Sequence, residues 1–440
     1  MSFTRRSALM TAAALFLAGG TVQAFAAGDD GGAVLRQWYR LVLRLVRHTA
    51  TYSPPVASRS FAYLGIAAYQ AVVTPSSGLA SLEGQLNGMP VLPARQQNEA
   101  YSDAVIIHCV MAQSVKAFFG NTGPTGQRVM AATEKKLKAA ALKDVAEDVA
   151  ARSLAFGEAL SAAILAWSES DGGAVVENMG FPMDYALNPA PGRWVPTSAI
   201  RQQQAPLLPN WGRNRAFAMP DGMACAIAPP PAYSEEPGSA FFREGLEVYE
   251  AVHNLTPEQE IIARFWSDDP MLSPTPPGHW VFIALDILDQ KEANAAKTAD
   301  VLMRLGVAMA DAFIGCWHAK FEYDLLRPVT YIRKVIDPKF EPLLITPPFP
   351  EYPSGHSVQS GAAAVVLTAA FGENFAFTDN THVRDGFAPR SFASFEAAAE
   401  EAGISRLYGG IHFRSSIDHG LAQGRCIGQH AVALRTRTAA

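Results

Sequence analysis

Charged side chains are scarce in this sequence of 440 residues, and so are cysteines, strand-like patterns and long apolar runs. Charged residues make up 18% of the chain, compared with roughly 25% in an average domain. The net charge is −5, which argues against nucleic acid as a partner because a nucleic-acid-binding surface is basic. Any local cluster of Lys and Arg therefore needs an explanation of its own.

The few cysteines also exclude a class of site. None of them forms a CxxC pair, so a thiolate zinc site is not expected. An oxidising compartment would permit disulfides, with three possible full pairings, and the sequence does not choose among them. Free thiols buried in helices are the simpler interpretation. The residues concerned are Cys109, Cys225, Cys316 and Cys426.

The first residues have the layout of a bacterial export signal. Arg5 and Arg6 precede a short apolar run at 8–18, and small residues follow in V-Q-A and A-F-A. Paired arginines are typical of the twin-arginine route. The apolar run falls short of the ~20 residues of a membrane span, and no later segment is read as one. We expect a signal at 1–27 and a mature protein in the periplasm or outside the cell.

Helical periodicity dominates the remaining chain and predicts an all-α fold with antiparallel bundle packing. A helical half at 28–172 and a second half at 240–440 flank a segment at 173–239. That segment is rich in Pro, Gly and Asn and indicates a long surface excursion or a cover over a site. The expected helices lie at 35–46, 57–73, 101–119, 127–167 (two helices), 242–252, 257–266, 280–288, 293–321, 355–371, 392–407 and 416–434.

A first group of candidate residues lies in WHAKFEYDLLRP, at 317–328. Lys320 and Arg327 are seven residues apart, which on one helix places them on the same face. Pro328 favours an end of the helix just after Arg327. A solvated basic face is the alternative, but the apolar neighbours Phe313 and Trp317 weaken it.

A second group is PSGHS, at 353–357, followed by small and apolar residues at helical spacing. This pattern puts Ser354 and Gly355 at a helix start, where free N–H groups and the helix dipole favour an oxyanion. Gly355 would let a backbone amide approach a ligand closely. The alternative is that Ser354 only caps the helix and His356 is an ordinary hydrogen-bonded residue.

A third group is SRLYGGIHFRSS, at 405–416. Arg406 and His412 are six residues apart, so on a continuous helix they would point about 120° away from each other. Gly409 and Gly410 can break the helix and let both side chains face one point. A plain interhelical turn with an exposed Arg and His is the alternative.

In this order the three groups resemble the signature of the superfamily of vanadium-dependent haloperoxidases and type 2 phosphatidic acid phosphatases. The resemblance implies a helical fold with a four-helix bundle around a bound oxyanion. His412 would be the vanadium ligand in a haloperoxidase or the nucleophile that forms a phosphohistidine in a phosphatase, and His356 would be the acid–base group. The residues implied to bind vanadate or phosphate are Lys320, Arg327, Ser354, Gly355 and Arg406.

Neighbouring residues favour the haloperoxidase branch. Trp317 and Phe349 match aromatic positions of vanadium chloroperoxidases and would form a halide site, whereas bromoperoxidases carry a second histidine at the latter position. Plain core packing is the alternative for both aromatics. The segments at 53–71 and 265–280 also resemble bacterial haloperoxidases, and Asp268 or Asp269 of the second segment is expected to orient an arginine.

One position departs from the family pattern. Many relatives have an acidic residue four positions after the last motif histidine, where it braces the acid–base histidine in the phosphatases. Ser416 occupies that position here, and the nearest acid is Asp418. This departure disfavours a standard lipid phosphatase.

The sequence therefore predicts an exported vanadium-dependent haloperoxidase with vanadate as cofactor. Its partners would be hydrogen peroxide, a halide and a small organic acceptor, and helical relatives often form homodimers. One alternative is a periplasmic acid phosphatase that acts on phosphomonoesters through phospho-His412. Another is a protein that binds an oxyanion without turnover.

Overall fold

The computed structural model describes residues 31–74, 77–198 and 200–437. The predicted signal at 1–27, including Arg5 and Arg6, lies outside the described residues. Within them the chain is mostly helical, and a single antiparallel pair of short strands, β1 (Phe377–Asp379) and β2 (Arg390–Phe392), interrupts the pattern. The predicted all-α class is confirmed.

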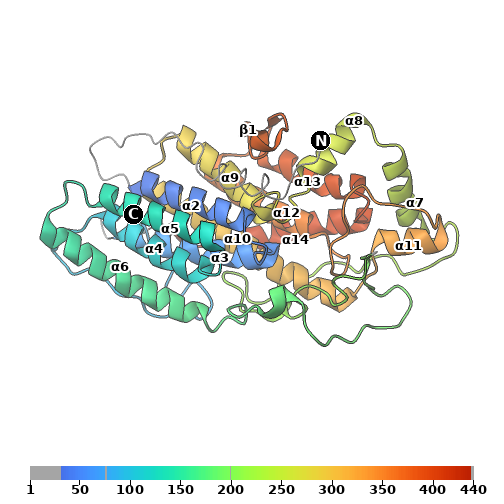
Figure 1. The fold of residues 1–440 in the computed structure, drawn as a ribbon, viewed down its shortest axis with the longest axis horizontal. Coiled ribbons are helices and arrows are strands. Elements are labelled where there is room, and N and C mark those ends of the chain that lie inside the picture. The colour runs from blue at the N-terminus through green and yellow to red at the C-terminus, as the bar shows by residue number, and fades with distance from the viewer. Residues whose placement is uncertain (1–30, 75–76, 199, 438–440) are drawn as a thin grey trace.

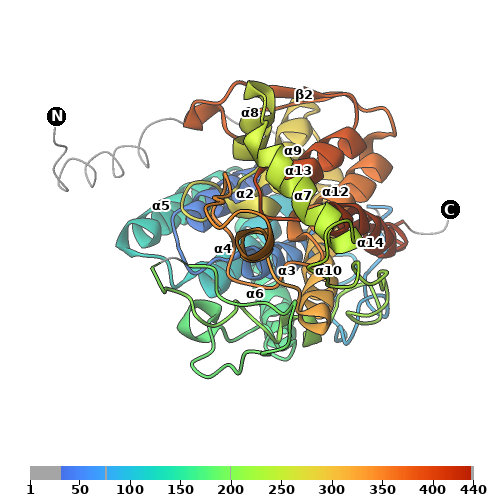
Figure 2. The same ribbon diagram turned by 90° about the vertical axis from the view of Figure 1, so that its right-hand side faces the viewer.

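The helices form two groups in the sequence, one on each side of the segment at 173–239. In Figure 1, α4, α5 and α6 lie toward one end, and α7 and α11 lie toward the other. In the view turned by 90°, the end that carries α7 faces the viewer (Figure 2). The first group is α2 (Gly31–Arg47), α3 (Pro54–Val72), α4 (Asp103–Phe119), α5 (Pro124–Ala141) and α6 (Glu147–Ser168). The second group is α7 (Ala240–His253), α8 (Pro257–Phe265), α9 (Thr275–Gln290), α10 (Ala295–Tyr323), α11 (Pro328–Val335), α12 (Gly355–Phe371), α13 (Phe395–Tyr408) and α14 (Arg414–Val432).

Every predicted helix is present, but the prediction that Lys320 and Arg327 share one helical face is wrong. α10 ends at Tyr323 because Asp324 takes the left-handed conformation, with φ 47°. Pro328 begins the short helix α11 rather than ending α10. A proline at the first helical position is favourable, since its missing N–H would have no partner there. Lys320 and Arg327 therefore lie on two different elements and not on one helical face.

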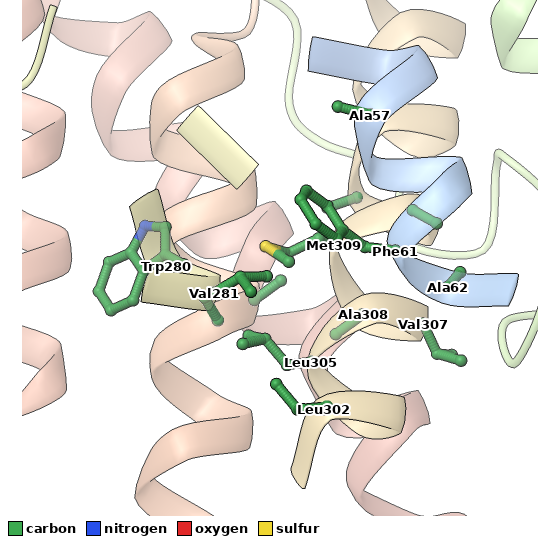
Figure 3. Packing of buried hydrophobic residues seen from close by; sticks show 14 of the residues in the cluster. Ala57, Phe61, Ala62, Trp280, Val281, Leu302, Leu305, Val307, Ala308 and Met309 are labelled. Carbon is green, nitrogen blue, oxygen red and sulfur yellow. The ribbon is translucent and has the colours of Figure 1, made fainter. Parts of the chain in front are cut away.

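The long helix α10 is the central element, and it packs against α3, α12 and α14. α3 approaches it so closely that a Cβ on Gly306 would lie 2.6 Å from the Phe61 carbonyl oxygen. Figure 3 shows Phe61 of α3 beside Met309 of α10, with Val281 of α9 on the other side. Such close crossing fixes α10, whose last turn carries Lys320.

A second close crossing joins α12 to α14. A Cβ on Gly424 would lie 2.0 Å from the Val358 carbonyl oxygen, and only glycine tolerates that contact. At the start of the same pair, the Ser354 amide donates to the Ser416 carbonyl at 3.1 Å. The PSGHS turn and the residues after His412 are therefore tied together by backbone contacts.

The irregular segment between the two groups contains only the short 3₁₀ helices η1 (Glu177–Gly180) and η2 (Trp211–Arg213) among its described residues. It lies directly on α10, because a Cβ on Gly212 would be 2.3 Å from the His318 amide nitrogen. A disulfide between Cys225 and Cys426 anchors it to α14. The other two cysteines, Cys109 and Cys316, are free and buried. The interpretation that all four cysteines are buried free thiols is therefore correct for these two only.

Helix α6 is the one helix of the described chain that is long and apolar enough to cross a membrane. This finding differs from the expectation that no segment after the leader meets that test. α6 packs along α4, and core helices of globular proteins pass the same test. One such helix is weak evidence for a span.

Candidate active site

Lys320, in the last turn of α10, is fully buried and points at the PSGHS turn. Its Nζ donates to the carbonyl oxygens of Pro350, Glu351 and Pro353 at 2.9, 2.9 and 2.6 Å. Three carbonyl acceptors use all three ammonium protons. Lys320 thus ties α10 to the turn and brings a positive charge to the base of the site.

Arg327, the N-cap residue of α11, is also fully buried. Its Nε donates to the Phe349 carbonyl at 2.9 Å, and its Nη1 donates to the Ile411 carbonyl at 3.0 Å. The same Nη1 lies 3.2 Å from Nε2 of His412. Because a guanidinium only donates hydrogen bonds, Nε2 is the acceptor. His412 therefore presents the lone pair of Nε2 beside Arg327.

Arg406, in the last turn of α13, approaches from the opposite side of the bundle. Its Nη1 donates to the Trp266 carbonyl at 2.6 Å and lies 3.4 Å from Nε2 of His356. The predicted helix break is confirmed, since α13 ends at Tyr408 and Gly410 has φ 76°. The break lets Arg406 and His412 belong to one site.

Ser354 and Gly355 form the start of α12, as predicted. Ser354 is the N-cap residue, and its Oγ accepts from the Ser357 amide at 3.3 Å. A Cβ on Gly355 would make only ordinary van der Waals contacts, the nearest with Trp317 at 3.8 Å. The capping role and the predicted oxyanion role of Ser354 are compatible, because the amides of the first turn remain available to a ligand.

Glu351 is the functional residue that sequence reasoning missed. It is fully buried, and its Oε1 lies 2.7 Å from Nδ1 of His412 and accepts from the Phe413 amide at 3.0 Å. Since Nε2 of His412 is an acceptor, Nδ1 carries the proton and donates it to Glu351. A carboxylate behind a ligating histidine is the usual device that fixes its tautomer. The only sequence signal was an acid inside an otherwise apolar, Pro-rich run.

One further expectation is corrected by these contacts, and the position of Asp418 is settled. Asp268 and Asp269 do not hydrogen-bond Arg406, whose Nη1 donates to the Trp266 carbonyl. The charges of both carboxylates oppose the effect of burial on the pKa of Arg406. Asp418 is exposed, so it does not replace the acid that relatives carry near the site. Ser416 instead lies with its Oγ 3.3 Å from Nδ1 of His412.

Burial and positive charge dominate the electrostatics. Burial lowers the pKa of Lys320 to about 7, and it lowers the pKa values of Arg327 and Arg406 to about 10 each. Burial, and next the charge of Arg327, holds the pKa of His412 well below its usual value. Burial and Arg406 do the same for the pKa of His356. Both imidazoles are therefore neutral beside three cationic groups.

Two guanidinium nitrogens in this pocket have no hydrogen-bond partner, although both are buried. They are Nη2 of Arg327 and Nε of Arg406. A buried donor without an acceptor is costly. An oxyanion between the two arginines would accept from both, since forked guanidinium donors match the oxygens of a tetrahedral anion.

The two predicted aromatics lie against the cations. The rings of Trp317 and Phe349 are 5.0 Å apart. Lys320 Nζ and Arg327 Cζ lie 5.2 and 4.9 Å from the centre of the Phe349 ring, within the range of a cation–π contact. Trp317 Nε1 donates to the Leu207 carbonyl at 3.2 Å, so the irregular segment covers this aromatic wall.

Comparisons with known proteins agree with this geometry. Residues 300–439 match the family model "VCPO second helical-bundle domain". A bacterial vanadium-dependent iodoperoxidase superposes with a TM-score of 0.83 at 37% identity, covering 92% of this chain and 97% of its own. A holo-type bacterial vanadium-dependent chloroperoxidase superposes with a TM-score of 0.66 at 18% identity, covering 87% of this chain and 94% of its own. An apo-type bacterial vanadium-dependent chloroperoxidase superposes with a TM-score of 0.63 at 16% identity, covering 86% of this chain and 93% of its own. Among curated protein sequences, none matches this chain.

Glu351→Gln and Glu351→Ala test the role of the missed carboxylate. Both should weaken the binding of orthovanadate to the protein, by roughly the 10–100-fold typical of a lost outer partner of a ligating histidine. Gln should cost less than Ala because its amide oxygen can still accept from Nδ1. Isothermal titration of vanadate into each variant gives the affinities.

Glu341→Gln is the matched control, because Glu341 is exposed and pairs with Arg333 outside the site. Its affinity should equal that of the unaltered protein. Equal vanadate affinity in folded Glu351→Ala would show that Glu351 does not position His412.

Proposed function

Since the chain belongs to the vanadium-dependent haloperoxidases, we propose that its buried pocket holds vanadate on Nε2 of His412 and that the enzyme oxidises a halide with hydrogen peroxide. The observation that carries the site assignment is the pair of buried donors without a partner, Arg327 Nη2 and Arg406 Nε, on the two arginines that contact His412 and His356. They fit an oxyanion, and the lone pair of His412 fits its central atom. A small organic acceptor would take up the oxidised halogen.

The side chains that would hold vanadate divide into three kinds. Positive charge comes from Lys320, Arg327 and Arg406, neutral donors come from Ser354 and the Gly355 amide, and His412 supplies the ligating nitrogen. Fixed cations in a buried site stabilise developing negative charge without reorganisation. Bound vanadate would supply Lewis-acid activation of the peroxide oxygen without a change of its own redox state.

His356 is the proposed acid–base group. It is neutral because burial and Arg406 hold its pKa well below the usual value, so it can accept a proton from an incoming hydrogen peroxide. The bound anion would offset the charge of Arg406 and raise the proton affinity of His356. His356 would then return the proton to the leaving oxygen.

Iodide is the halide we propose first. The relative with 37% identity is an iodoperoxidase, and iodide is the most polarisable of the candidate halides. The aromatic pair Trp317 and Phe349 forms the apolar wall beside the cations. Bromide and chloride belong in the same assay, because this pair also resembles that of chloroperoxidases.

Vanadate-loaded protein with hydrogen peroxide and iodide tests the activity directly. The unaltered enzyme should form oxidised iodine. In His412→Ala the rate should fall by more than roughly 100-fold, because loss of the ligand itself should lower the rate more than loss of a residue that hydrogen-bonds the ligand. The rate of triiodide formation measures both. His318→Ala is the control, since His318 lies on α10 near Lys320 but is partly exposed and pairs with Glu322.

Hydrolysis of a chromogenic phosphomonoester without halide oxidation would contradict the proposal and favour the acid phosphatase. Binding of vanadate without either activity would favour a protein that only binds oxyanions. Retained turnover in folded His412→Ala would contradict the assignment of His412.

The aromatic wall generates a second prediction. Trp317→Ala and Phe349→Ala should lower iodide turnover per folded molecule, because a wetter pocket screens the cations and loses the apolar contact with the halide. Vanadate affinity should change less, since the ligating residues remain. Specific activity and melting temperature are measured on the same samples.

Phe61→Ala is the matched control for this pair. Phe61 is fully buried between α3 and α10, away from the pocket, and its loss should cost roughly 3–5 kcal/mol of stability with unchanged specific activity. If Trp317→Ala and Phe349→Ala behave like Phe61→Ala, the two aromatics are core and not a halide site.

We also propose that the protein is exported. The paired arginines near the N-terminus support a twin-arginine signal, and the Cys225–Cys426 disulfide is typical of an oxidising compartment. Replacing Arg5 and Arg6 by lysine should leave the protein in the cytoplasm, as measured by immunoblotting of cell fractions. Normal export of the double variant would point to the general secretory route, and cytoplasmic retention of the unaltered protein would contradict export.

A further inference from the structure

A buried cluster of acids and histidines lies behind the pocket, and none of the proposed catalytic steps uses it. His279, in the first half of α9, is fully buried. Its Nδ1 lies 2.8 Å from Oδ2 of Asp268, and its Nε2 lies 2.7 Å from Oδ2 of Asp379. A carboxylate only accepts hydrogen bonds, so both ring nitrogens carry protons. His279 is thus an imidazolium held between two aspartates.

Further contacts close this cluster. Oδ1 of Asp268 lies 3.2 Å from Nε2 of His382, whose Nδ1 lies 3.1 Å from Asp385. Oδ1 of Asp379 accepts from the amide and the hydroxyl of Thr381 at 2.8 and 2.6 Å. Every carboxylate oxygen of Asp268 and Asp379 therefore accepts at least one hydrogen bond. Such hydrogen bonds offset the free-energy cost of burying the two charges.

The imidazolium ring stacks on the indole of Trp266. The ring centres are 4.5 Å apart and the planes differ by 19°. The indole Nε1 donates to Glu401 at 2.9 Å. Trp266 is consequently fixed on its face by His279 and at its edge by Glu401.

The carbonyl of the same tryptophan reaches the pocket. It accepts from Arg406 Nη1 at 2.6 Å, and the same Nη1 lies 3.4 Å from Nε2 of His356. The Trp266 carbonyl thus holds Arg406, and Arg406 in turn contacts His356, the proposed acid–base group. Any shift of Trp266 would move both.

The backbone conformation of the loop after Trp266 is set by tertiary contacts. Asp268, Met271 and Thr275 all have positive φ, at 49°, 68° and 66°. Non-glycine residues adopt this region only when the surroundings over-determine the backbone. The hydrogen bonds of Asp268 to His279 and His382 are the contacts that hold the first of these residues.

We infer that Asp268, His279 and Asp379 form a positioning unit that fixes the Trp266 carbonyl and, through it, aims Arg406 and His356 at the oxyanion. The inference rests on the proposed oxyanion site. The charged groups that face His279 are Asp268 and Asp379, with His382 at its edge, while Asp269 and Arg406 lie beyond Trp266. The unit carries a net negative charge on the side of Arg406, which favours the charged form of that guanidinium.

His279→Leu and His279→Gln test the unit in the full-length protein. His279→Leu should weaken the binding of orthovanadate by roughly 10-fold, the lower end for outer partners of a metal site. His279→Gln should recover part of this loss, because its amide can donate to one aspartate. Isothermal titration with orthovanadate gives the affinities, and circular dichroism confirms the fold.

Asp311→Asn is the control. Asp311 is equally buried and accepts from the amides of Phe217, Ala218 and Met219, far from the Trp266 carbonyl. This variant should lose thermal stability but keep its vanadate affinity. If His279→Leu does not fold, Asp379→Asn carries the test, since it is isosteric and leaves the Asp268–His279 pair in place; its affinity should fall by a smaller factor.

The outcomes separate this inference from the proposed function. An unaltered protein that does not bind vanadate contradicts the oxyanion site itself. Vanadate binding by the unaltered protein, together with equal affinity in folded His279→Leu or Asp379→Asn, contradicts only the positioning unit.

A measurement on the histidine ring and one on metal content complete the test. Nitrogen-15 spectra of labelled protein should show an imidazolium signal at pH 8 that is lost in His279→Gln and is therefore assigned to His279. A neutral ring would overturn the inference. So would one equivalent of a divalent metal in the purified protein, because Asp268, His279 and His382 place their ligand atoms within 4.8 Å of one another and a metal-bound ring nitrogen cannot carry the proton.

Discussion

Burial of three cationic side chains around one small volume is the constraint on which the rest of this structure depends. Lys320, Arg327 and Arg406 are removed from water almost completely, and a charge in such a place persists only with acceptors on every side. The carbonyl groups of the PSGHS turn, of Ile411 and of Trp266 supply many of these acceptors. Arg327 Nη2 and Arg406 Nε remain without an acceptor. A bound oxyanion would supply the missing acceptors, and this gain would contribute to its affinity.

The residues of the proposed anion site lie at the ends of helices and not in helix interiors. Lys320 lies in the last turn of α10, Arg327 caps α11, Ser354 caps α12, and Arg406 lies in the last turn of α13. Helix ends carry unpaired carbonyl and amide groups, so they can hold a side chain and an anion at once. The close glycine crossings of α3 with α10 and of α12 with α14 keep these ends from drifting. The close packing of the bundle therefore holds the site residues at the helix ends in fixed positions.

Local patterns in the sequence predict the fold and most of the pocket, because periodicity, caps and glycine breaks act over a few residues. α12 and the Gly409–Gly410 break are of this kind. The separation of Arg327 from the helix of Lys320 was not predicted, since the left-handed conformation of Asp324 between them is set by its surroundings. Glu351 was missed for the same reason: an acid at the end of an apolar, Pro-rich stretch acquires meaning only when folding places it behind His412. The Cys225–Cys426 pairing and the contacts of His279 join segments far apart in sequence, and no local signal encodes them.

Neutral imidazoles beside buried cations explain how one pocket can serve two steps. A protonated His412 could not ligate a central atom, and a protonated His356 could not accept a proton. Burial and the neighbouring guanidinium groups lower both pKa values, while Glu351 fixes which nitrogen of His412 is free. An arriving oxyanion opposes the charge that lowers the pKa of His356 and leaves the tautomer of His412 unchanged. In the proposed mechanism, the anion that fills the pocket would therefore make His356 a better proton acceptor, while the tautomer of His412 would not change.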